Sequence, residues 1–286
     1  MSKERTILKN CTITGFADEI NKNMDTQIAL LNQLGVKWIE FRSGDGINVA
    51  DYTLDQAKAL KEKLDANGIK ISAIGSPIGK IGIEDDFEPH LEKLAHVIEI
   101  AKILETDKIR MFSFFMPKEA ADVSVYRDEV FRRTKAMIEL AKQHNIILLH
   151  ENEKGIYGDN GPRCLELMKE FFCDNYRCTF DFANFVQCGQ DPLEAYEMLA
   201  PYVTYVHVKD ARNDSHMVVP AGQGDGKLKE VFALLDKAGY EGFLSLEPHL
   251  TNFIGLQNLE KDVQKRDRDD GENAFCQAYD ALVGLL

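Results

Sequence analysis

The feature that most constrains this chain is an apolar run, Ile146 to Leu149, that ends abruptly in polar and charged residues. The run has no polar alternation, which is typical of a strand that is covered on both faces in a parallel sheet. His150, Glu151 and Glu153 follow it at once. Because catalytic groups of parallel α/β folds lie at the carboxyl ends of the strands, the segment predicts a buried strand that ends in a functional site.

Three later segments repeat this arrangement: 177–180 leads into Asp181, 203–206 into His207 and 242–246 into Glu247. Taken alone, a strand-end Asp or Glu is more often a helix N-cap or a solvated charge. Four successive strands that end this way favour a shared site instead. Three carboxylates and one imidazole suit manganese(II) best, while magnesium, cobalt(II) and zinc are compatible with them. The sequence therefore predicts one divalent metal ion held by Glu151, Asp181, His207 and Glu247.

The rest of the chain repeats a strand-then-helix unit. We expect further strands at 12–16, 37–41, 69–74 and 108–115. We expect helices at 24–34, 53–67, 90–104, 123–143, 161–172, 191–199 and 271–285, and one more helix that follows the glycine loop and ends at 238. Asp191 is expected to cap its helix. With the four segments above, the strands number eight, and neither a linker nor a change in composition divides them. This pattern predicts a single (β/α)8 TIM barrel over residues 1–286, preferred to an open sheet because four adjacent strands share the site.

Several segments leave two interpretations open. Phe112, Phe114 and Phe115 either fill the barrel or form a hydrophobic wall for a carbon chain, and we favour filling. The glycine loop 222–226 is neither a P-loop nor a dinucleotide fingerprint, although it can approach a substrate closely. The charge run 259–270 is expected to be a solvated surface.

Composition narrows the class of function. The chain has 34 basic and 47 acidic residues, and its net charge of −13 argues against nucleic-acid binding because it repels a phosphate backbone. No apolar stretch approaches 18 residues and the first residues lack the apolar core of a signal peptide, so we expect a cytoplasmic protein without a membrane partner. The six cysteines are scattered, without a Cys-x-x-Cys pair, and are expected to be reduced thiols. Homo-oligomerisation is compatible with the sequence.

Six motifs together resemble the xylose-isomerase-like superfamily, and more narrowly its sugar phosphate isomerase/epimerase branch. They are Gly15-Phe-Ala-Asp-Glu-Ile20, Trp38-Ile-Glu-Phe-Arg42, His150-Glu-Asn-Glu-Lys-Gly155, His207-Val-Lys-Asp210, Gly222-Gln-Gly-Asp-Gly226 and Leu246-Glu-Pro-His249. The resemblance to ketose 3-epimerases implies that the four predicted ligands carry one divalent metal. It also implies that Glu151 and Glu247 face the reacting carbon from opposite sides as an acid/base pair.

The implied chemistry is physically reasonable. A metal that binds a carbonyl and the neighbouring hydroxyl acidifies the C–H between them by stabilising an enediolate, and two carboxylates on opposite faces remove and return the proton. Return to the opposite face gives epimerisation, and return to the neighbouring carbon gives isomerisation. The chain departs from the epimerases where Tyr157 lies near the position of an auxiliary Glu and Asn184 replaces a His. We therefore expect different substrate contacts, chosen from Glu40, Arg42, Ser76, Lys154, Asn184, Lys209 and His249. For Lys154 and Lys209 a solvated rim is equally compatible, and His150 is expected to face the other side of its strand as a core or metal-supporting histidine.

These observations predict a metal-dependent isomerase or epimerase that acts on a small-molecule carbohydrate or a related polyhydroxy carbonyl compound. An inosose-type dehydratase on the same metal site and a non-catalytic sugar-binding barrel are the alternatives. An endonuclease IV-like nuclease is disfavoured, because the seven histidines do not supply its metal cluster. We also expect an unphosphorylated substrate, since Asp210 and Asp225 balance the cations Lys209, Arg212 and His216 near the glycine loop.

Overall fold

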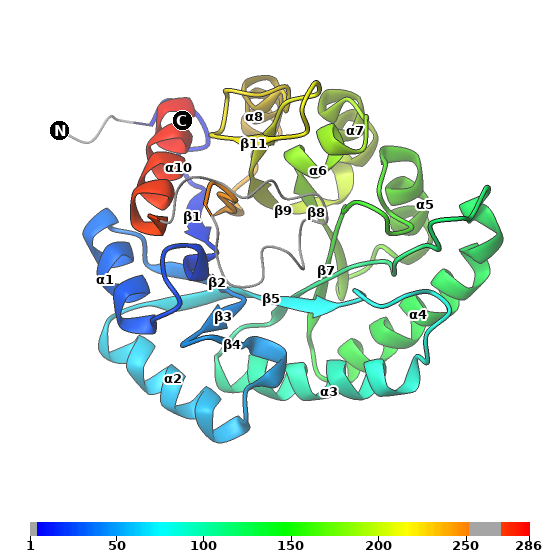
Figure 1. The fold of residues 1–286 in the computed structure, drawn as a ribbon, viewed down its shortest axis with the longest axis horizontal. Coiled ribbons are helices and arrows are strands. Elements are labelled where there is room, and N and C mark those ends of the chain that lie inside the picture. Colours follow the sequence, from blue (N-terminus) through cyan, green and yellow to red (C-terminus); the bar gives the residue numbers. More distant parts are fainter. Residues whose placement is uncertain (1–4, 252–269) are drawn as a thin grey trace.

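A computed structural model describes residues 5–251 and 270–286, and its centre is a sheet of eight parallel strands (Figure 1). The strands pair in the order β1-β12-β9-β8-β7-β6-β5-β2, and β1 and β2, at the two ends of this order, contact each other. Their bounds are β1 Thr12–Gly15, β2 Trp38–Phe41, β5 Lys70–Ile78, β6 Lys108–Met111, β7 Ile147–Glu151, β8 Tyr176–Asp181, β9 Val203–Val208 and β12 Phe243–Leu246. The strands form a nearly closed (β/α)8 barrel, as the sequence predicted.

Helices surround the strands on the outside (Figure 1). Their bounds are α1 Met24–Leu34, α2 Leu54–Ala66, α3 Glu88–Ile103, α4 Arg127–Gln143, α5 Gly161–Phe171, α6 Phe182–Gln187, α7 Pro192–Leu199, α8 Leu228–Lys237 and α10 Gly271–Leu285. Local signals fix many of the ends. Thr53 and Gln56 form a capping box before α2, Asp191 caps α7, and Gly35 ends α1 in a left-handed conformation. The chain ends meet where the Ile7 amide donates to the Leu286 carbonyl at 2.9 Å.

Short elements decorate the loops, and all except the 3-10 turn between α7 and β9 follow the carboxyl ends of strands. They are β3 Ser43–Gly44, β4 Ile47–Asn48, β10 Asp210–Ala211 and β11 Val218–Val219, together with the 3-10 turns η1 Ala17–Glu19, η2 Val49–Asp51, η3 Val123–Tyr126 and η4 Ala200–Tyr202. The antiparallel pair β10–β11 ties the glycine loop to the end of β9. These loops position side chains around the candidate site.

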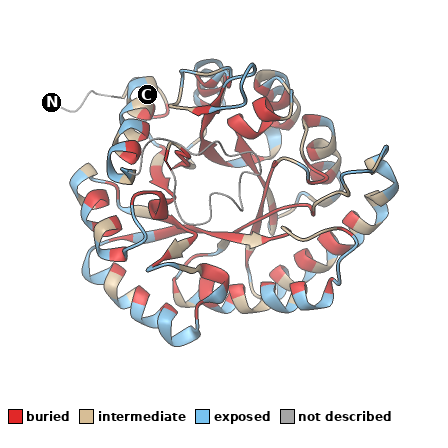
Figure 2. Cartoon of the chain, viewed as in Figure 1, coloured by how far each residue is buried: buried red, intermediate tan, exposed pale blue. Residues whose placement is uncertain are grey.

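The main hydrophobic core lies between the helices and the outer face of the strands. Figure 2 shows the buried residues on the strands and on the helix faces that turn towards them. Inside the barrel the apolar layer is small and consists of Ala73, Leu149 and Tyr205 with Ile147 and Phe243 packed on it. Phe112 and Phe114 are fully buried and Phe115 is half-buried. Phe114 belongs to the main core and Phe112 contacts Arg110 and Lys80, so barrel filling by these rings stays a prediction.

Two strands differ from their predicted bounds. The Gly-Ser-Pro stretch after Ile74 was expected to turn, but it belongs to β5, whose register against β6 shifts between Ile74 and Ile78. Ser76 fills this gap because its hydroxyl donates to the Arg110 carbonyl and accepts the Ile78 amide. The expected strand 108–115 stops at Met111, and Phe114 takes a left-handed φ of 66° that a strand does not tolerate. Helix α6, directly after β8, was not predicted.

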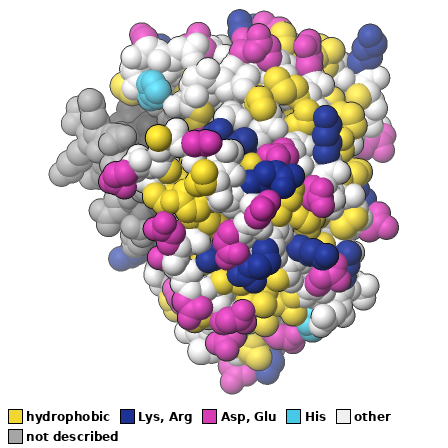
Figure 3. Space-filling view, turned by 90° about the vertical axis from the view of Figure 1, so that its right-hand side faces the viewer, with side chains coloured by type: hydrophobic (Ala, Val, Ile, Leu, Met, Phe, Trp, Pro, Cys, Tyr) yellow, Lys and Arg dark blue, Asp and Glu magenta, His cyan; other side chains and the backbone are white. Residues whose placement is uncertain are grey.

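Other sequence expectations are met where the structure can test them. All six cysteines are free. Within residues 5–251 and 270–286, no helix combines the length and apolar character that a membrane crossing requires. Basic and acidic side chains are interspersed over the face shown in Figure 3. Most of the charge run 259–270 lies outside the described residues.

Candidate metal centre

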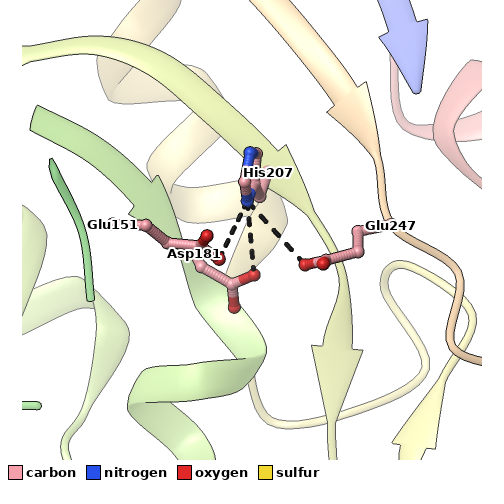
Figure 4. A group of neighbouring side chains, drawn as sticks. All are labelled: Glu151, Asp181, His207 and Glu247. Carbon is pink, nitrogen blue, oxygen red and sulfur yellow. Dashed lines mark hydrogen bonds and ion pairs between the residues drawn. The ribbon is translucent and has the colours of Figure 1, made fainter. Parts of the chain in front are cut away.

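The four predicted ligands meet at the carboxyl ends of four neighbouring strands (Figure 4). Glu151 Oε, Asp181 Oδ, His207 Nδ1 and Glu247 Oε all lie within 4.8 Å of one another, and all four residues are buried. Glu151 and Asp181 are the last residues of β7 and β8, His207 lies in β9, and Glu247 follows β12 directly. The sheet itself brings them together, since Asp181 stands opposite His207 in the β8–β9 ladder.

The imidazole of His207 is fixed on both of its nitrogen atoms. Nδ1 faces the cluster, 2.9 Å from Glu151 Oε1, and Nε2 lies 3.0 Å from Glu40 Oε2 on the other side of the ring. Ser245 donates to the same Glu40 oxygen at 2.6 Å. Burial lowers the pKa of His207, but Glu151 and Glu40 outweigh it and hold that pKa well above its usual value. An Nε2–H bond to Glu40 leaves Nδ1 as the nitrogen that can bind a metal.

Each carboxylate of the cluster has one oxygen held from outside. Glu151 Oε2 lies 3.2 Å from Arg110 Nη1, and Glu247 Oε1 lies 3.4 Å from Arg42 Nη1. Asp181 Oδ1 accepts a hydrogen bond from the backbone amide of Asn184 at 2.7 Å. The Asp181 contact is also the N-cap of α6, so the N-cap and cluster interpretations of this residue are both correct. The second oxygens remain directed at the centre: Glu151 Oε1, Glu247 Oε2 and Asp181 Oδ2 lie 2.9, 3.7 and 3.9 Å from His207 Nδ1.

Lys209 is the cation closest to these inner oxygens among the described residues. Its Nζ lies 2.7 Å from Glu247 Oε2 and 3.2 Å from Asp181 Oδ2, and only 4% of the residue is exposed, which excludes the solvated-rim interpretation. Burial raises the pKa of Asp181 to about 7, with Lys209 opposing the shift. Burial also acts on Glu247, but Lys209 and His249 outweigh it and hold its pKa well below the usual value.

The donor set fits a divalent ion. Asp181 Oδ2 is buried and accepts no hydrogen bond from the described residues, although Lys209 lies beside it. An ion bound between the inner oxygens and His207 Nδ1 would give this atom a partner without disturbing the outer contacts. Three carboxylate oxygens and one imidazole nitrogen are ligands of manganese, magnesium, cobalt or zinc.

A second group of possible ligands, Glu19, Glu247 and His249, lies next to the first. Arg42 already binds it, with Nη2 3.0 Å from Glu19 Oε1 and Nη1 3.4 Å from Glu247 Oε1. Glu19 Oε2 also accepts the His249 backbone amide at 2.6 Å. A guanidinium on the same oxygens makes this group an ion-pair network that orients Glu247.

The predicted substrate contacts separate into two groups. Arg42, Asn184, Lys209 and His249 touch carboxylates of the cluster directly. Glu40 contacts His207 from behind the imidazole, and the Ser76 hydroxyl forms hydrogen bonds with backbone groups. Lys154 is half-buried and has no side-chain contact with the cluster among the described residues. These positions favour a supporting role for Glu40 and Ser76 over the substrate contact that was expected.

His150 belongs to the core, as the sequence suggested. It is fully buried, and neither ring nitrogen has a hydrogen-bond partner among the described residues. Burial lowers its pKa to about 3. The neutral ring therefore packs on the outer side of β7, in a tilted arrangement against Tyr176.

A stack of cations and aromatic rings faces the cluster and was missed by the sequence analysis. Phe16 lies between the guanidinium groups of Arg42 and Arg110, at 4.5 and 4.8 Å, and Phe112 lies between Arg110 and Lys80, at 5.0 and 4.3 Å. Lys80 in turn pairs with Glu153 at 3.0 Å. The position of Arg110 between Ile109 and Met111 in a strand was the available signal, because a buried guanidinium requires a carboxylate partner.

The glycine loop after β9 is not an open anion cradle. The amides of Gly222, Gly224 and Gly226 each donate to the buried carboxylate of Asp210 at 2.9 Å. A Cβ at Gly224 would lie 2.4 Å from the Ala211 carbonyl, so this close approach requires glycine. Arg212 and His216 point to solvent. The loop serves to fix the chain directly after Lys209.

The model of the xylose isomerase-like TIM barrel family matches residues 28–267, so the chain belongs to this family. A 3-dehydroshikimate dehydratase from Bacillus anthracis is 31% identical over 140 residues, 49% of each chain. The matches to curated relatives span between 29% and 56% of those proteins.

Solved structures share the fold. A D-allulose 3-epimerase from Methylomonas sp. in complex with D-allulose has a TM-score of 0.75 at 14% identity and covers 96% of this chain and 97% of its own. The IolI protein with a bound zinc atom has a TM-score of 0.74 at 15% identity and covers 96% of this chain and 96% of its own.

Proposed function

We propose that this chain is a divalent-metal-dependent isomerase or epimerase that acts on a sugar or a related polyhydroxy carbonyl compound. The observation that carries the proposal is the arrangement of Glu151, Asp181, His207 and Glu247, each with one ligand atom directed at a common centre. A metal held there would polarise a carbonyl oxygen and acidify the neighbouring C–H. Manganese suits the ligand set best, and the zinc in the IolI neighbour supports the same kind of site.

In this proposal Glu151 and Glu247 move the proton. The contacts of Glu247 with Lys209 and His249 keep it ionised, as a proton acceptor must be. Arg110 touches both carboxylates, with Nη1 3.2 Å from Glu151 Oε2 and 3.6 Å from Glu247 Oε1. It thereby couples their positions through Glu151 Oε2 and Glu247 Oε1, while the other oxygen of each carboxylate faces the centre of the cluster. Asn184 and His249, which contact Glu151 and Glu247, are the candidate donors to substrate hydroxyls.

The local charge supports an uncharged substrate. Among the described residues in ion-pair contact around the cluster, seven carboxylates (Asp18, Glu19, Glu40, Glu151, Glu153, Asp181 and Glu247) face four Lys and Arg side chains (Arg42, Lys80, Arg110 and Lys209). His249 adds one positive charge, because Glu19 and Glu247 outweigh its burial and raise its pKa to about 9. A divalent ion bound to a neutral His207 then brings the sum to balance, which leaves no positive surplus for a phosphate. The glycine amides that usually bind phosphate already bind Asp210.

A dehydratase is the second candidate, and the 31% match to the 3-dehydroshikimate dehydratase favours it. Dehydration begins with the same proton removal and differs in expelling a β-hydroxyl group. A turnover screen with manganese across ketoses, aldoses, inososes and 3-dehydroshikimate separates the two activities. An isomerase or epimerase returns a product of unchanged mass in H2O, which becomes heavier by the deuteron taken up when the reaction runs in D2O, whereas a dehydratase product lacks one water.

The metal content of the purified protein tests the metal dependence that both candidate functions share. We expect one divalent ion per chain and turnover that a chelator abolishes and manganese restores. A metal-free protein that binds a sugar without converting it would overturn the enzyme proposal in favour of a sugar-binding barrel. Titrations with a ketose and its phosphate ester test the substrate class: much tighter binding of the ester, lost in Arg212→Ala, would contradict an uncharged substrate.

A further inference from the structure

Lys209 differs from the other cations of the site in the oxygens that it contacts. Arg42 and Arg110 hold the outer oxygens, Glu247 Oε1 and Glu151 Oε2. Lys209 Nζ instead lies on Glu247 Oε2 and Asp181 Oδ2, the oxygens that face His207 Nδ1 at 3.7 and 3.9 Å. A metal ion and the ammonium group therefore require the same lone pairs.

We propose that Lys209 is an internal counter-ion of the metal-free cluster, and that a divalent ion displaces its ammonium group from Glu247 Oε2 and Asp181 Oδ2. The inference rests on the proposed function, because it takes the four-residue cluster to be a metal site. Buried carboxylates at this separation repel one another strongly and need a positive charge nearby. Lys209 supplies that charge when no metal is bound.

The surroundings of Lys209 allow the exchange to occur in the side chain alone. Asp210, the next residue, accepts the amides of three glycines and so fixes the backbone. The lysine stem is flexible, and its compact ammonium group can leave one carboxylate for another acceptor. The charge of Glu153, already paired with Lys80, also acts on Lys209. The released ammonium group is then available to a substrate oxygen, which is the contact that the sequence predicted for Lys209.

The test compares Lys209→Met with the wild type and with Lys154→Met, a half-buried lysine that follows β7 and lies outside the cluster. Thermal unfolding of the metal-free proteins and calorimetric titration with Mn²⁺ are measured. We expect metal-free Lys209→Met to unfold at a lower temperature than the wild type. We expect it to bind Mn²⁺ at least about tenfold more tightly, because the competing charge is gone. Mn²⁺ should therefore raise its unfolding temperature more than that of the wild type, and Lys154→Met should match the wild type.

The outcomes separate this inference from the proposed function. If the wild type binds Mn²⁺ but Lys209→Met shows unchanged stability and equal or weaker affinity, the counter-ion role is wrong and the metal site stands. If the wild type binds no divalent ion, the proposed function itself fails. Should Lys209→Met not fold, crystals of the wild type with and without Mn²⁺ decide the question. The contact from Nζ to Glu247 Oε2 should be present without metal and lost with it, and its persistence in the loaded protein would refute the displacement.

Discussion

The two halves of the barrel contribute side chains with different roles to one site. Strands β7, β8, β9 and β12 end in the carboxylates and the imidazole of the candidate metal centre. The first half, with β1, β2, β5 and β6, supplies Arg42, Lys80 and Arg110, stacked on Phe16 and Phe112. The second half thus carries the groups proposed for chemistry, and the first half carries the charges that hold them in place.

This difference explains why the groups that the second half contributes can be predicted from the sequence, whereas those of the first half cannot. A ligand such as Glu151 stands at a strand end, where a parallel sheet always gathers functional groups. A supporting cation such as Arg110 stands inside a strand, and its role depends on a carboxylate from the other half of the chain. The first pattern is local and the second is not.

The largest effect is expected for the proposed acid/base pair of the second half. Glu151→Gln and Glu247→Gln each keep the shape of the side chain but cannot accept a proton. We predict that each lowers kcat by about 10³-fold, within the range of lost general acid–base catalysis, while the free energy of unfolding changes far less. Steady-state kinetics on the true substrate at saturating Mn²⁺, with urea unfolding alongside, measures both. Activity near the wild-type level in either variant would contradict the two-base mechanism.

The next effect concerns the first half and should appear in stability. Arg110→Met leaves Glu151 Oε2 without its guanidinium partner in a buried site. We predict that it lowers the free energy of unfolding of the metal-free protein by about 3 kcal/mol. Lys108→Met on the same strand removes a lysine that, among the described residues, pairs only with its neighbour Asp107, and it should cost less than about 1 kcal/mol. Urea denaturation measures both, and equal losses would show that the stack does not support the second half.

Glu40 bridges the halves, since it comes from β2 and holds His207 of β9. Glu40→Gln keeps the volume but removes the charge that orients the imidazole. We predict a loss of Mn²⁺ affinity of about 10–100-fold with little change in fold, the range known for partners of metal-bound histidines. Calorimetry measures the affinity, and Glu241→Gln, an exposed glutamate just before β12, is the control. Unchanged affinity in Glu40→Gln would mean that His207 needs no support from the first half.

The smallest effect depends on pH and lies in the first half alone. His90 accepts the Gly79 amide at 2.7 Å, and burial lowers its pKa to about 4. A folded-state pKa below the unfolded value of 6.5 contributes stability that is present above pH 6.5 and is lost as pH falls towards 4. We predict that the wild type loses about 2 kcal/mol from this group by pH 5.

His90→Gln offers an acceptor to Gly79 but does not titrate, so its stability should fall less between pH 7 and pH 5. His216→Gln, at an exposed position, should follow the wild type. Identical pH profiles for all three proteins would place the acid sensitivity elsewhere.

The sequence predicted most of the fold because its signals are local. Helices α1 and α10 have the expected bounds, and Asp191 caps α7 as expected. The Gly-Ser-Pro stretch of β5 was misread because its pairing depends on the Ser76 bond to Arg110, which only the folded sheet brings together. Helix α6 was missed because its N-cap, Asp181, was assigned to the cluster alone, whereas its two oxygens serve both roles.

The candidate site shows the same limit. The convergence of Glu151, Asp181, His207 and Glu247 followed from strand ends, and the structure brings the four together. The position of Glu40 behind the imidazole did not follow, because the alternation of a strand shows which face a residue takes but not which side chain it meets. The metal and catalytic roles of the four residues stay predictions.

The most direct test of the central claim is the metal stoichiometry of the wild type, Asp181→Asn and Glu153→Gln after loading with Mn²⁺. The asparagine can still cap α6 through its oxygen but presents no charge to the centre, whereas Glu153 lies two residues beyond Glu151 and outside the cluster. We predict one ion per chain for the wild type and Glu153→Gln, and nearly none for Asp181→Asn. Full occupancy in Asp181→Asn, or none in the wild type, would contradict a metal centre built from these four residues.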